Sequence, residues 1–157
     1  PEWIDFPREG NGWSYARARR QWSLARNGFL RYAWLGYFDR AMLRLVKRWK
    51  VLSDDYPYNL LMDERNKTMV FSRRDLLFVF NWHPAASIPD YELPVPAAGR
   101  YVPVLSTDER RFGGTERASM ASVHFSRPAP GPDGTERPCI RIYNTSRTAT
   151  VFRRLKR

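Results

Sequence analysis

The feature that most restricts the fold of this chain is a change in hydrophobic periodicity near residue 51. Within residues 28–50, apolar side chains recur at steps of three and four, which is typical of an amphipathic helix packed on a larger body. The face comprises Leu35, Phe38, Met42, Leu45, Val46 and Trp49. Asn27 precedes this segment and is a suitable N-cap. After residue 51, short apolar runs alternate with turn residues and show no helical period. The pattern predicts an N-terminal helical part followed by a mostly β domain.

The β part contains one hairpin pattern and one continuous apolar run. Residues 58–62 and 68–71 flank a polar turn, and residues 76–82 have the length and composition of a central strand buried on both faces. Further strands are predicted at 101–105, 123–125, 139–143 and 148–155. Prolines are expected between strands, where their missing N–H costs no ladder bond; they are Pro84, Pro89, Pro94, Pro96, Pro128, Pro130 and Pro132. Residues 107–122 and 126–138 are predicted to be irregular, and the whole to form an antiparallel β-sandwich from about residue 52 to the end.

The charge of the chain is strongly positive, but its distribution does not favour a nucleic-acid-binding protein. The net charge is +11, and residues 1–50 hold eleven Lys or Arg against four Asp or Glu. Arginines beside aromatic residues can bind phosphates and bases. Yet no helix-turn-helix, zinc-finger or RNA-recognition pattern is present, and the basic residues alternate with apolar ones. We therefore expect a solvated basic surface that adheres weakly to polyanions and no nucleic-acid partner.

The few cysteine and histidine residues give little support for metal or redox chemistry. Cys139 is the only cysteine, so no internal disulfide can form; a buried, inert thiol and a cytoplasmic location are expected. His83 precedes a proline and is interpreted as a turn residue, and His124 as a half-exposed strand position. These three side chains are too few for a typical zinc site, so no metal is predicted. No apolar run approaches the roughly 20 residues needed to span a bilayer, and no signal peptide is visible. The chain is expected to be soluble, without a membrane partner, and cut from something longer.

The first 24 residues contain the combination of side chains most suited to binding a ligand. Aromatic residues alternate there with carboxylates and arginines, and Pro7, Gly10 and Gly12 interrupt regular structure. Such a loop could bind a sugar through ring faces and charged groups, or could be a packed crossing loop. The residues alone favour the packed loop, because loops of this kind bury their aromatic side chains more often than they expose them. Asp5 and Glu9 are the only early carboxylate pair, and in a broken loop their spacing fixes no distance for a retaining glycosidase. No nucleophile elbow or phosphate-binding glycine loop occurs, and no cofactor is predicted.

The strings PEWIDFPR at residues 1–8 and LLFVFNWHP at residues 76–84 are the longest of several blocks that carry a family resemblance. Through them the sequence resembles the C-terminal part of branching enzymes of the α-amylase family of glycoside hydrolases. The similar blocks occur in order along nearly the whole chain: residues 1–8, 10–11, 18–24, 30–32, 38–42, 76–84, 90–91, 104–109, 112–114, 143 and 146–149. They include the strings PEWIDFPR, ARRQWSL, FDRAM, LLFVFNWHP, VLSTDE, FGG and SRTA. Ala33 and Trp34 stand where the family usually has a Lys or another polar residue.

The resemblance implies two domains. Residues 1–51 would be the end of a (β/α)8 barrel, comprising the loop after the eighth strand and the last outer helix, and residues 52–157 the C-terminal all-β domain. Barrel loops of this family line the active-site cleft. The resemblance therefore implies that Trp3 stacks on a glucose ring of an α-glucan substrate, while Asp5 and Arg8 contact hydroxyls or brace their neighbours. A structural ion pair is an equally good interpretation of Arg8.

The function implied is transfer of an α-1,4-glucan segment to a 6-hydroxyl, which creates an α-1,6 branch. The three catalytic carboxylates of the family lie upstream of this segment, so the chain alone is expected to be inactive, and its partner would be the upstream barrel of the same protein. One alternative is a free-standing glucan-binding module in which Trp82 or Trp34 stacks on sugar. Another is a basic nucleic-acid-binding protein with steep salt dependence.

Overall fold

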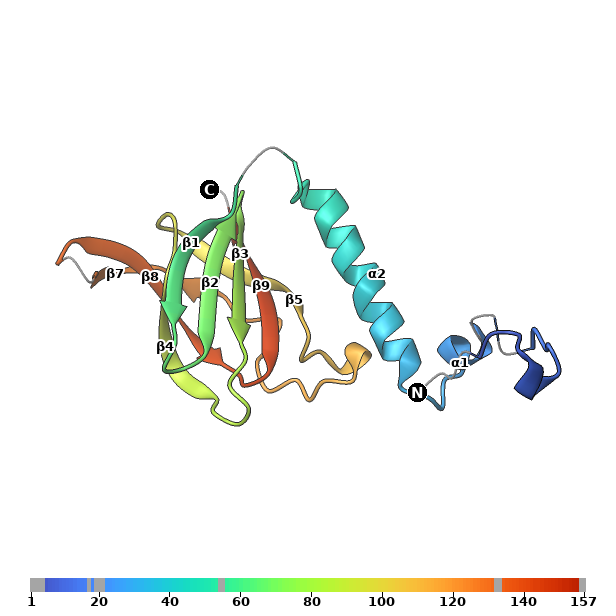
Figure 1. Cartoon of the computed structure of the whole chain (residues 1–157). Coiled ribbons are helices and arrows are strands. Elements are labelled where there is room, and N and C mark those ends of the chain that lie inside the picture. The colour runs from blue at the N-terminus through green and yellow to red at the C-terminus, as the bar shows by residue number, and fades with distance from the viewer. Residues whose placement is uncertain (1–4, 17, 19–21, 54–55, 132–133, 156–157) are drawn as a thin grey trace.

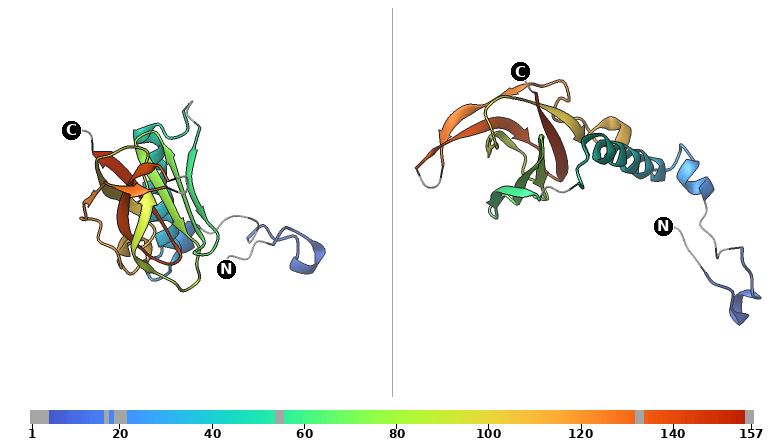
Figure 2. Two further views of the ribbon diagram at one scale, coloured as in Figure 1. Left: turned by 90° about the vertical axis from the view of Figure 1, so that its left-hand side faces the viewer. Right: turned by 90° about the horizontal axis from the view of Figure 1, so that it is seen from above.

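A computed structural model describes residues 5–16, 18, 22–53, 56–131 and 134–155. Three helical elements come first: the 3-10 helix η1 (Glu9–Asn11) and the α-helices α1 (Trp22–Arg26) and α2 (Tyr32–Trp49). Among the described residues, the strands and a further 3-10 helix are β1 (Tyr58–Asp63), β2 (Thr68–Arg73), β3 (Leu76–Asn81), β4 (Ile88–Pro94), β5 (Arg100–Ser106), η2 (Arg110–Phe112), β6 (His124–Phe125), β7 (Arg127–Pro130), β8 (Glu136–Asn144) and β9 (Thr148–Leu155). Figures 1 and 2 show α2 beside the β domain, with α1 and η1 beyond its N-terminal end. None of the described helices is long and apolar enough to cross a membrane.

The β domain consists of two antiparallel sheets, as the sequence predicts. The larger sheet has the strand order β1-β2-β3-β9-β5-β6 and the smaller has the order β4-β8-β7. The predicted hairpin is confirmed as β1 and β2, with Asp63 opposite Thr68 at the turn. The predicted strand at 76–82 is confirmed as β3, in the interior of the large sheet between β2 and β9.

The positions of several prolines differ from the prediction. Pro89 and Pro94 lie in β4, and Pro128 and Pro130 lie in β7, inside what was predicted to be an irregular segment. Both strands are edges of the small sheet and pair only with β8. Edge strands tolerate proline because one row of backbone groups faces away from the ladder. These four prolines therefore lie in edge strands, where the sequence pattern suggested boundaries, whereas Pro103 lies in β5 and Pro138 in β8, the central strand of the small sheet.

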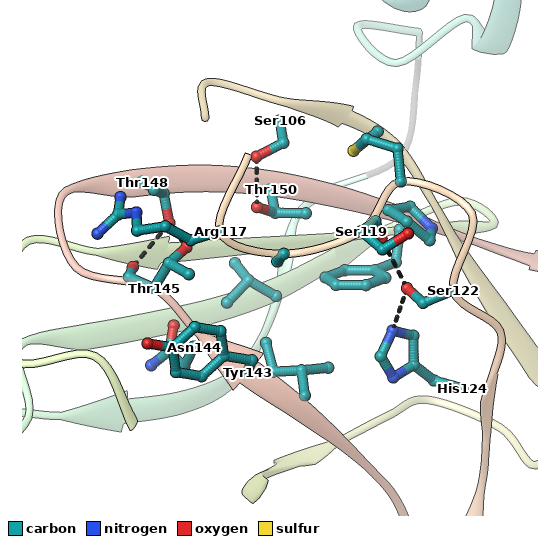
Figure 3. Close-up of a pocket in the computed structure, with 16 residues that line it drawn as sticks. Ser106, Arg117, Ser119, Ser122, His124, Tyr143, Asn144, Thr145, Thr148 and Thr150 are labelled. Carbon is teal, nitrogen blue, oxygen red and sulfur yellow. Dashed lines mark hydrogen bonds between the residues drawn. The ribbon is translucent and has the colours of Figure 1, made fainter. Parts of the chain in front are cut away.

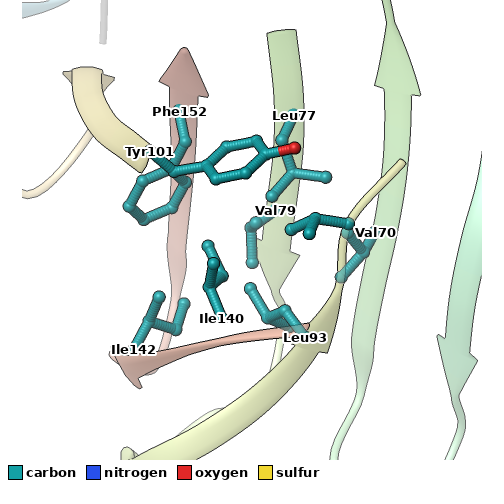
Figure 4. Packing of buried hydrophobic residues seen from close by; sticks show 9 residues of the cluster. Val70, Leu77, Val79, Leu93, Tyr101, Ile140, Ile142 and Phe152 are labelled. Atoms are coloured by element: carbon teal, nitrogen blue, oxygen red, sulfur yellow. The ribbon is translucent and has the colours of Figure 1, made fainter. Parts of the chain in front are cut away.

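The main core lies between the two sheets. Figure 4 shows its side chains meeting from β2, β3, β4, β5, β8 and β9. Tyr101 is almost fully buried, and its hydroxyl donates to the Ala97 carbonyl at 2.7 Å, which satisfies its only polar group. The cluster comprises Val70, Leu77, Val79, Leu93, Val95, Tyr101, Ile140, Ile142 and Phe152.

The outer face of the large sheet carries a row of stacked aromatic rings. Phe71 stacks on Phe78 with centroids 4.8 Å apart, and Phe80 stacks on Trp82 with centroids 5.3 Å apart. Phe78 and Phe80 are half-buried, and the Trp82 side chain is 56% exposed. The prediction that residues 76–82 are buried on both faces is therefore right at Leu76, which lies on this outer face and is covered by α2, and wrong toward Trp82. The row of rings lacks a second sheet against it, because the small sheet covers only the opposite face.

Helix α2 differs from the prediction at its start and on its apolar face. It begins at Tyr32 with Arg31 as N-cap, whereas the Asn27 side chain accepts from the backbone N–H of Phe29 in a preceding turn. Phe38 and Leu45 pack against the β domain in a second cluster with β3, β5 and β9. Leu35, in contrast, is 72% exposed among the described residues. The helix thus buries one stripe and leaves a second apolar stripe, formed by Tyr32, Leu35 and Leu43, largely exposed.

Candidate functional site

The N-terminal loop is held together by its own polar side chains. The Arg8 guanidinium donates to both carboxylate oxygens of Asp5, at 3.1 and 3.4 Å. The Asn11 amide donates to the same carboxylate at 3.1 Å and to the Phe6 carbonyl at 3.0 Å. The Arg8 backbone N–H in turn donates to the Asn11 side chain at 3.0 Å. These contacts shape residues 5–11 into a turn closed by η1.

This arrangement places two of the three predicted substrate-binding residues side by side. Hydrogen bonding and charge attraction from Asp5 raise the pKa of Arg8, so its guanidinium remains charged. Asp5 is half-buried and Arg8 exposed, so Arg8 keeps donor groups that can reach a ligand. Trp3 lies outside the described residues, and its predicted role stays a prediction. The loop lies beyond α1 and away from both sheets (Figures 1 and 2).

The second polar centre lies in the irregular segment between β5 and β6, where Asp108 is the anchor. Its buried carboxylate accepts from the backbone N–H of Arg117 at 2.8 Å, from that of Thr115 at 3.3 Å, and from the Arg117 guanidinium at 3.1 Å. Arg117 also donates to the Ser146 carbonyl at 2.9 Å and to its hydroxyl at 3.1 Å. The pair thus ties the β5–β6 segment to the β8–β9 turn.

The pKa of Asp108 reflects two opposing effects. Burial alone would raise it, but the hydrogen bonds from Arg117 and Thr115 and the Arg117 charge outweigh burial and hold the pKa below the ordinary value. The carboxylate is therefore ionised and fully engaged at neutral pH. Asp108 stabilises the fold and is not available as a general acid or base.

A small cavity opens between this segment and the sandwich. It has a volume of about 200 Å³, with Val79, Ile142 and Phe152 on its apolar side. Figure 3 shows hydroxyl side chains around it, with Ser106 bonded to Thr150, Thr145 to Thr148, and Ser122 to His124. No Asp, Glu or Lys lines it, so the lining side chains suited to acid–base chemistry are those of His124 and Tyr143.

Neither histidine is placed for catalysis. The His83 ring accepts from the backbone N–H of Ala85 and Ala86, which confirms its interpretation as a turn residue. His124 is half-exposed in β6, bonds Ser122 and the Arg141 carbonyl, and packs edge-on against Phe152. Within the described ranges, no group of three or more His, Cys, Asp or Glu residues could hold a metal ion.

The junction between α2 and the β domain depends on the Phe112-Gly113-Gly114 segment. The Phe38 and Phe112 rings meet edge to face with centroids 5.4 Å apart. Gly113 has φ = 83°, and a Cβ at this position would overlap the Trp34 ring; a Cβ at Gly114 would overlap the Asp108 backbone. The sequence indicates the need for backbone freedom at these glycines, but not that α2 is what approaches Gly113.

The comparison with known families agrees with this architecture. The profile described as "Alpha amylase, C-terminal all-beta domain" matches residues 58–154, from the first strand to the last. The chain belongs to this family. The match covers both sheets and excludes α2 and the N-terminal loop.

The curated relatives extend the similarity across those N-terminal elements. The chain is 40% identical over 155 residues to a 1,4-alpha-glucan-branching enzyme of Dictyostelium discoideum, covering 99% of this chain and 23% of the relative. It is 38% identical over 161 residues to a chloroplastic/amyloplastic 1,4-alpha-glucan-branching enzyme of Oryza sativa subsp. japonica, covering 99% and 20%. It is 42% identical over 152 residues to the 1,4-alpha-glucan-branching enzyme of Saccharomyces cerevisiae, covering 97% and 21%. The chain thus spans about a fifth of these relatives and is homologous to their C-terminal region.

Proposed function

We propose that this chain is the C-terminal part of a 1,4-α-glucan branching enzyme. In this proposal, the upstream barrel supplies the catalytic carboxylates, cleaves an α-1,4-glucan and transfers the segment to a 6-hydroxyl. Residues 1–51 supply a cleft loop and the last barrel helix, and residues 52–157 a stabilising β domain. The reaction needs no cofactor, and the parent protein is expected in the cytoplasm, without nucleic-acid or membrane partners.

One observation carries the proposal: similarity to branching enzymes continues through α2, whose second apolar stripe is largely exposed among the described residues. The family profile alone ends at the β domain, but the relatives match 97–99% of the chain. Leu35 is 72% exposed on α2 and Leu43 is 49% exposed. A helix with apolar residues on two sides is normally buried between two bodies. The β domain covers one side, and the upstream barrel is the proposed cover for the other.

The Asp5–Arg8 pair fits a supporting role in a glucan-binding cleft. An ion pair in a loop orders both side chains, and the remaining guanidinium N–H groups can donate to sugar hydroxyls. The proposal assigns substrate contact to Arg8 and Trp3, and to Asp5 the positioning of Arg8. Catalytic residues are not assigned to this chain.

The test is a graft. Residues 1–157 replace the homologous C-terminal segment of the Saccharomyces cerevisiae enzyme, to which this chain is 42% identical. Branching is followed by the loss of iodine staining and by counting α-1,6 linkages. The graft is expected to form branches, whereas the isolated chain and the truncated yeast protein are not. A folded graft without activity would contradict the proposal.

A second candidate, a glucan-binding module without catalysis, is favoured by Trp82. Its ring ends the aromatic row with one face on Phe80 and is 56% exposed, so a glucose ring could stack on the other face. Sedimentation of the isolated chain with glycogen, with Trp82→Ala as the control, distinguishes this candidate. Retention that depends on Trp82, together with an inactive graft, would favour the binding module.

A further inference from the structure

A groove between α2 and the large sheet contains four arginines. Arg44 and Arg48 enter it from α2, Arg111 from η2, and Arg153 from β9. The groove has a volume of about 470 Å³ and is open to solvent. Its elements belong to one packed unit, because Leu45 of α2 contacts the same cluster as β5 and β9. The four guanidinium groups are therefore brought together by the fold of the domain.

The positive charge of this groove is largely uncompensated among the described residues. Arg111 pairs with Glu109 at 2.7 Å, but Arg44 and Arg48 make no ion pair with any residue that the structure describes. These two lie one helical turn apart, where like charges repel. The Arg153 Nε atom is buried and has no hydrogen-bond partner in the described chain. This Nε atom is closed to solvent, so the donors of the groove that a ligand can reach include those of Arg44, Arg48 and Arg111, which are all exposed.

The geometry favours an anion over a neutral sugar ring. Trp49 is the aromatic residue of the groove, and guanidinium groups already lie over it, Arg153 at 5.2 Å and Arg48 at 5.4 Å from the ring centroid. A glucose ring that stacked on Trp49 would have to displace them. An anion would instead bind the guanidinium groups where they are. Phosphate is the best-matched small anion, because its oxygens accept the paired N–H groups of arginine and its charge can reach −2.

We propose that this arginine groove, defined by Arg44, Arg48, Arg111 and Arg153, binds a phosphate group. The phosphate is either inorganic or carried by a sugar, since both present the same dianionic oxygens. The site lies on the side of α2 that faces the β domain, apart from the Asp5–Arg8 loop and from the cavity beside His124. The proposal does not depend on branching activity, because it concerns binding to this chain alone.

The test titrates ¹⁵N-labelled chain with inorganic phosphate, with glucose 6-phosphate and with glucose, at constant ionic strength set by chloride. The reporter is the indole N–H resonance of Trp49, assigned with Trp49→Phe. The test variant is Arg44→Gln/Arg48→Gln, which changes two exposed side chains. The control is Arg65→Gln/Arg127→Gln, which removes the same charge at exposed sites in the β1–β2 turn and in β7.

Saturable shifts with phosphate and glucose 6-phosphate, but not with glucose, are the expected result. The test variant is expected to weaken binding at least tenfold, and the control variant less than twofold. Saturation by glucose 6-phosphate at a lower concentration would identify a sugar-borne phosphate, and equal affinities would identify inorganic phosphate as sufficient. Linear shifts, or equal losses in both variants, would show nonspecific attraction by the net charge and overturn the proposal. Binding of a poly-glutamate peptide without binding of phosphate would also overturn it.

Discussion

The ring of Trp34 lies against Gly113, so close that three of its carbon atoms would be within 2.8 Å of a Cβ at that position. Gly113 ends η2 in the left-handed region, with φ = 83°. Two requirements therefore coincide at this residue: a backbone angle that L side chains rarely adopt, and contact with the helix. Glycine at this position is what allows α2 to dock on the β domain.

Gly113→Ala is expected to destabilise the chain by about 2–4 kcal/mol, the sum of left-handed strain and overpacking. The measurement is urea unfolding of the isolated chain. In a Trp34→Ala background the same change should cost only about 1–2 kcal/mol, because the strain remains while the overlap is gone.

Gly36→Ala is the matched control for this substitution. Gly36 lies inside α2, and a Cβ there would meet nothing within 4 Å. Alanine should stabilise the helix by up to about 1 kcal/mol. Equal costs for Gly113→Ala with and without Trp34 would contradict the proposed contact.

The acid stability of the chain should depend on Asp108. Its folded pKa is lowered, so its contribution is fully present above the unfolded pKa of about 3.9 and is lost as the pH falls through the folded value. Asp108→Asn should cost about 1–3 kcal/mol at pH 7 and flatten the decline in stability below about pH 4.

The measurement is the urea midpoint between pH 7 and pH 2. Glu64→Gln, in the exposed β1–β2 turn, makes the same charge change and should leave the pH profile unchanged. An Asp108→Asn profile parallel to that of the unsubstituted chain would refute the role of the Arg117 pair.

Charged substitutions in the second apolar stripe of α2 should be beneficial in the isolated chain and harmful in the yeast graft. Leu35→Glu/Leu43→Glu should reduce self-association of the isolated chain, since it replaces exposed apolar side chains with charges. In the yeast graft the same pair should lower branching activity at least tenfold, because the charges would be buried against the barrel. Light scattering and the iodine assay provide the two readouts, and unchanged activity in the graft would exclude a buried role for the stripe.

The ion pair of the N-terminal loop should affect substrate use in the graft. Arg8→Gln is expected to raise the KM for amylose about 3–10-fold, consistent with the loss of one solvent-exposed hydrogen bond worth about 1 kcal/mol. Asp5→Asn should have a smaller effect of the same kind, since it would leave Arg8 in place but less ordered. Steady-state kinetics with Glu9→Gln as the control distinguishes substrate contact from a general loss of charge. A lowered kcat with unchanged KM would contradict the assignment.

The spacing of apolar residues, every second residue in strands and every three to four residues in the helix, was sufficient to predict most of the fold. The β1–β2 hairpin, the central strand β3 and the long helix were all predictable because burial on one or both faces leaves a mark in local sequence. Strands β4 and β7 were not, because proline hides an edge strand that needs only one row of hydrogen bonds.

The polar centres depended on contacts distant in sequence. Asp108 and Ser146 lie in blocks that resemble the family, but Arg117, which joins them, carries no local signal. The arginine groove combines side chains from α2, η2 and β9, so the sequence shows only an excess of positive charge. For the N-terminal loop, the sequence left open whether Arg8 contacts sugar or forms an ion pair; the structure contains the ion pair with Asp5.

The most direct test of the account is the number of α-1,6 linkages formed per minute by the Saccharomyces cerevisiae graft carrying residues 1–157. We expect a rate within about tenfold of the yeast enzyme and none for the yeast protein truncated at the same position. A graft that folds, binds glucan and forms no branches would contradict the claim that this chain completes a branching enzyme.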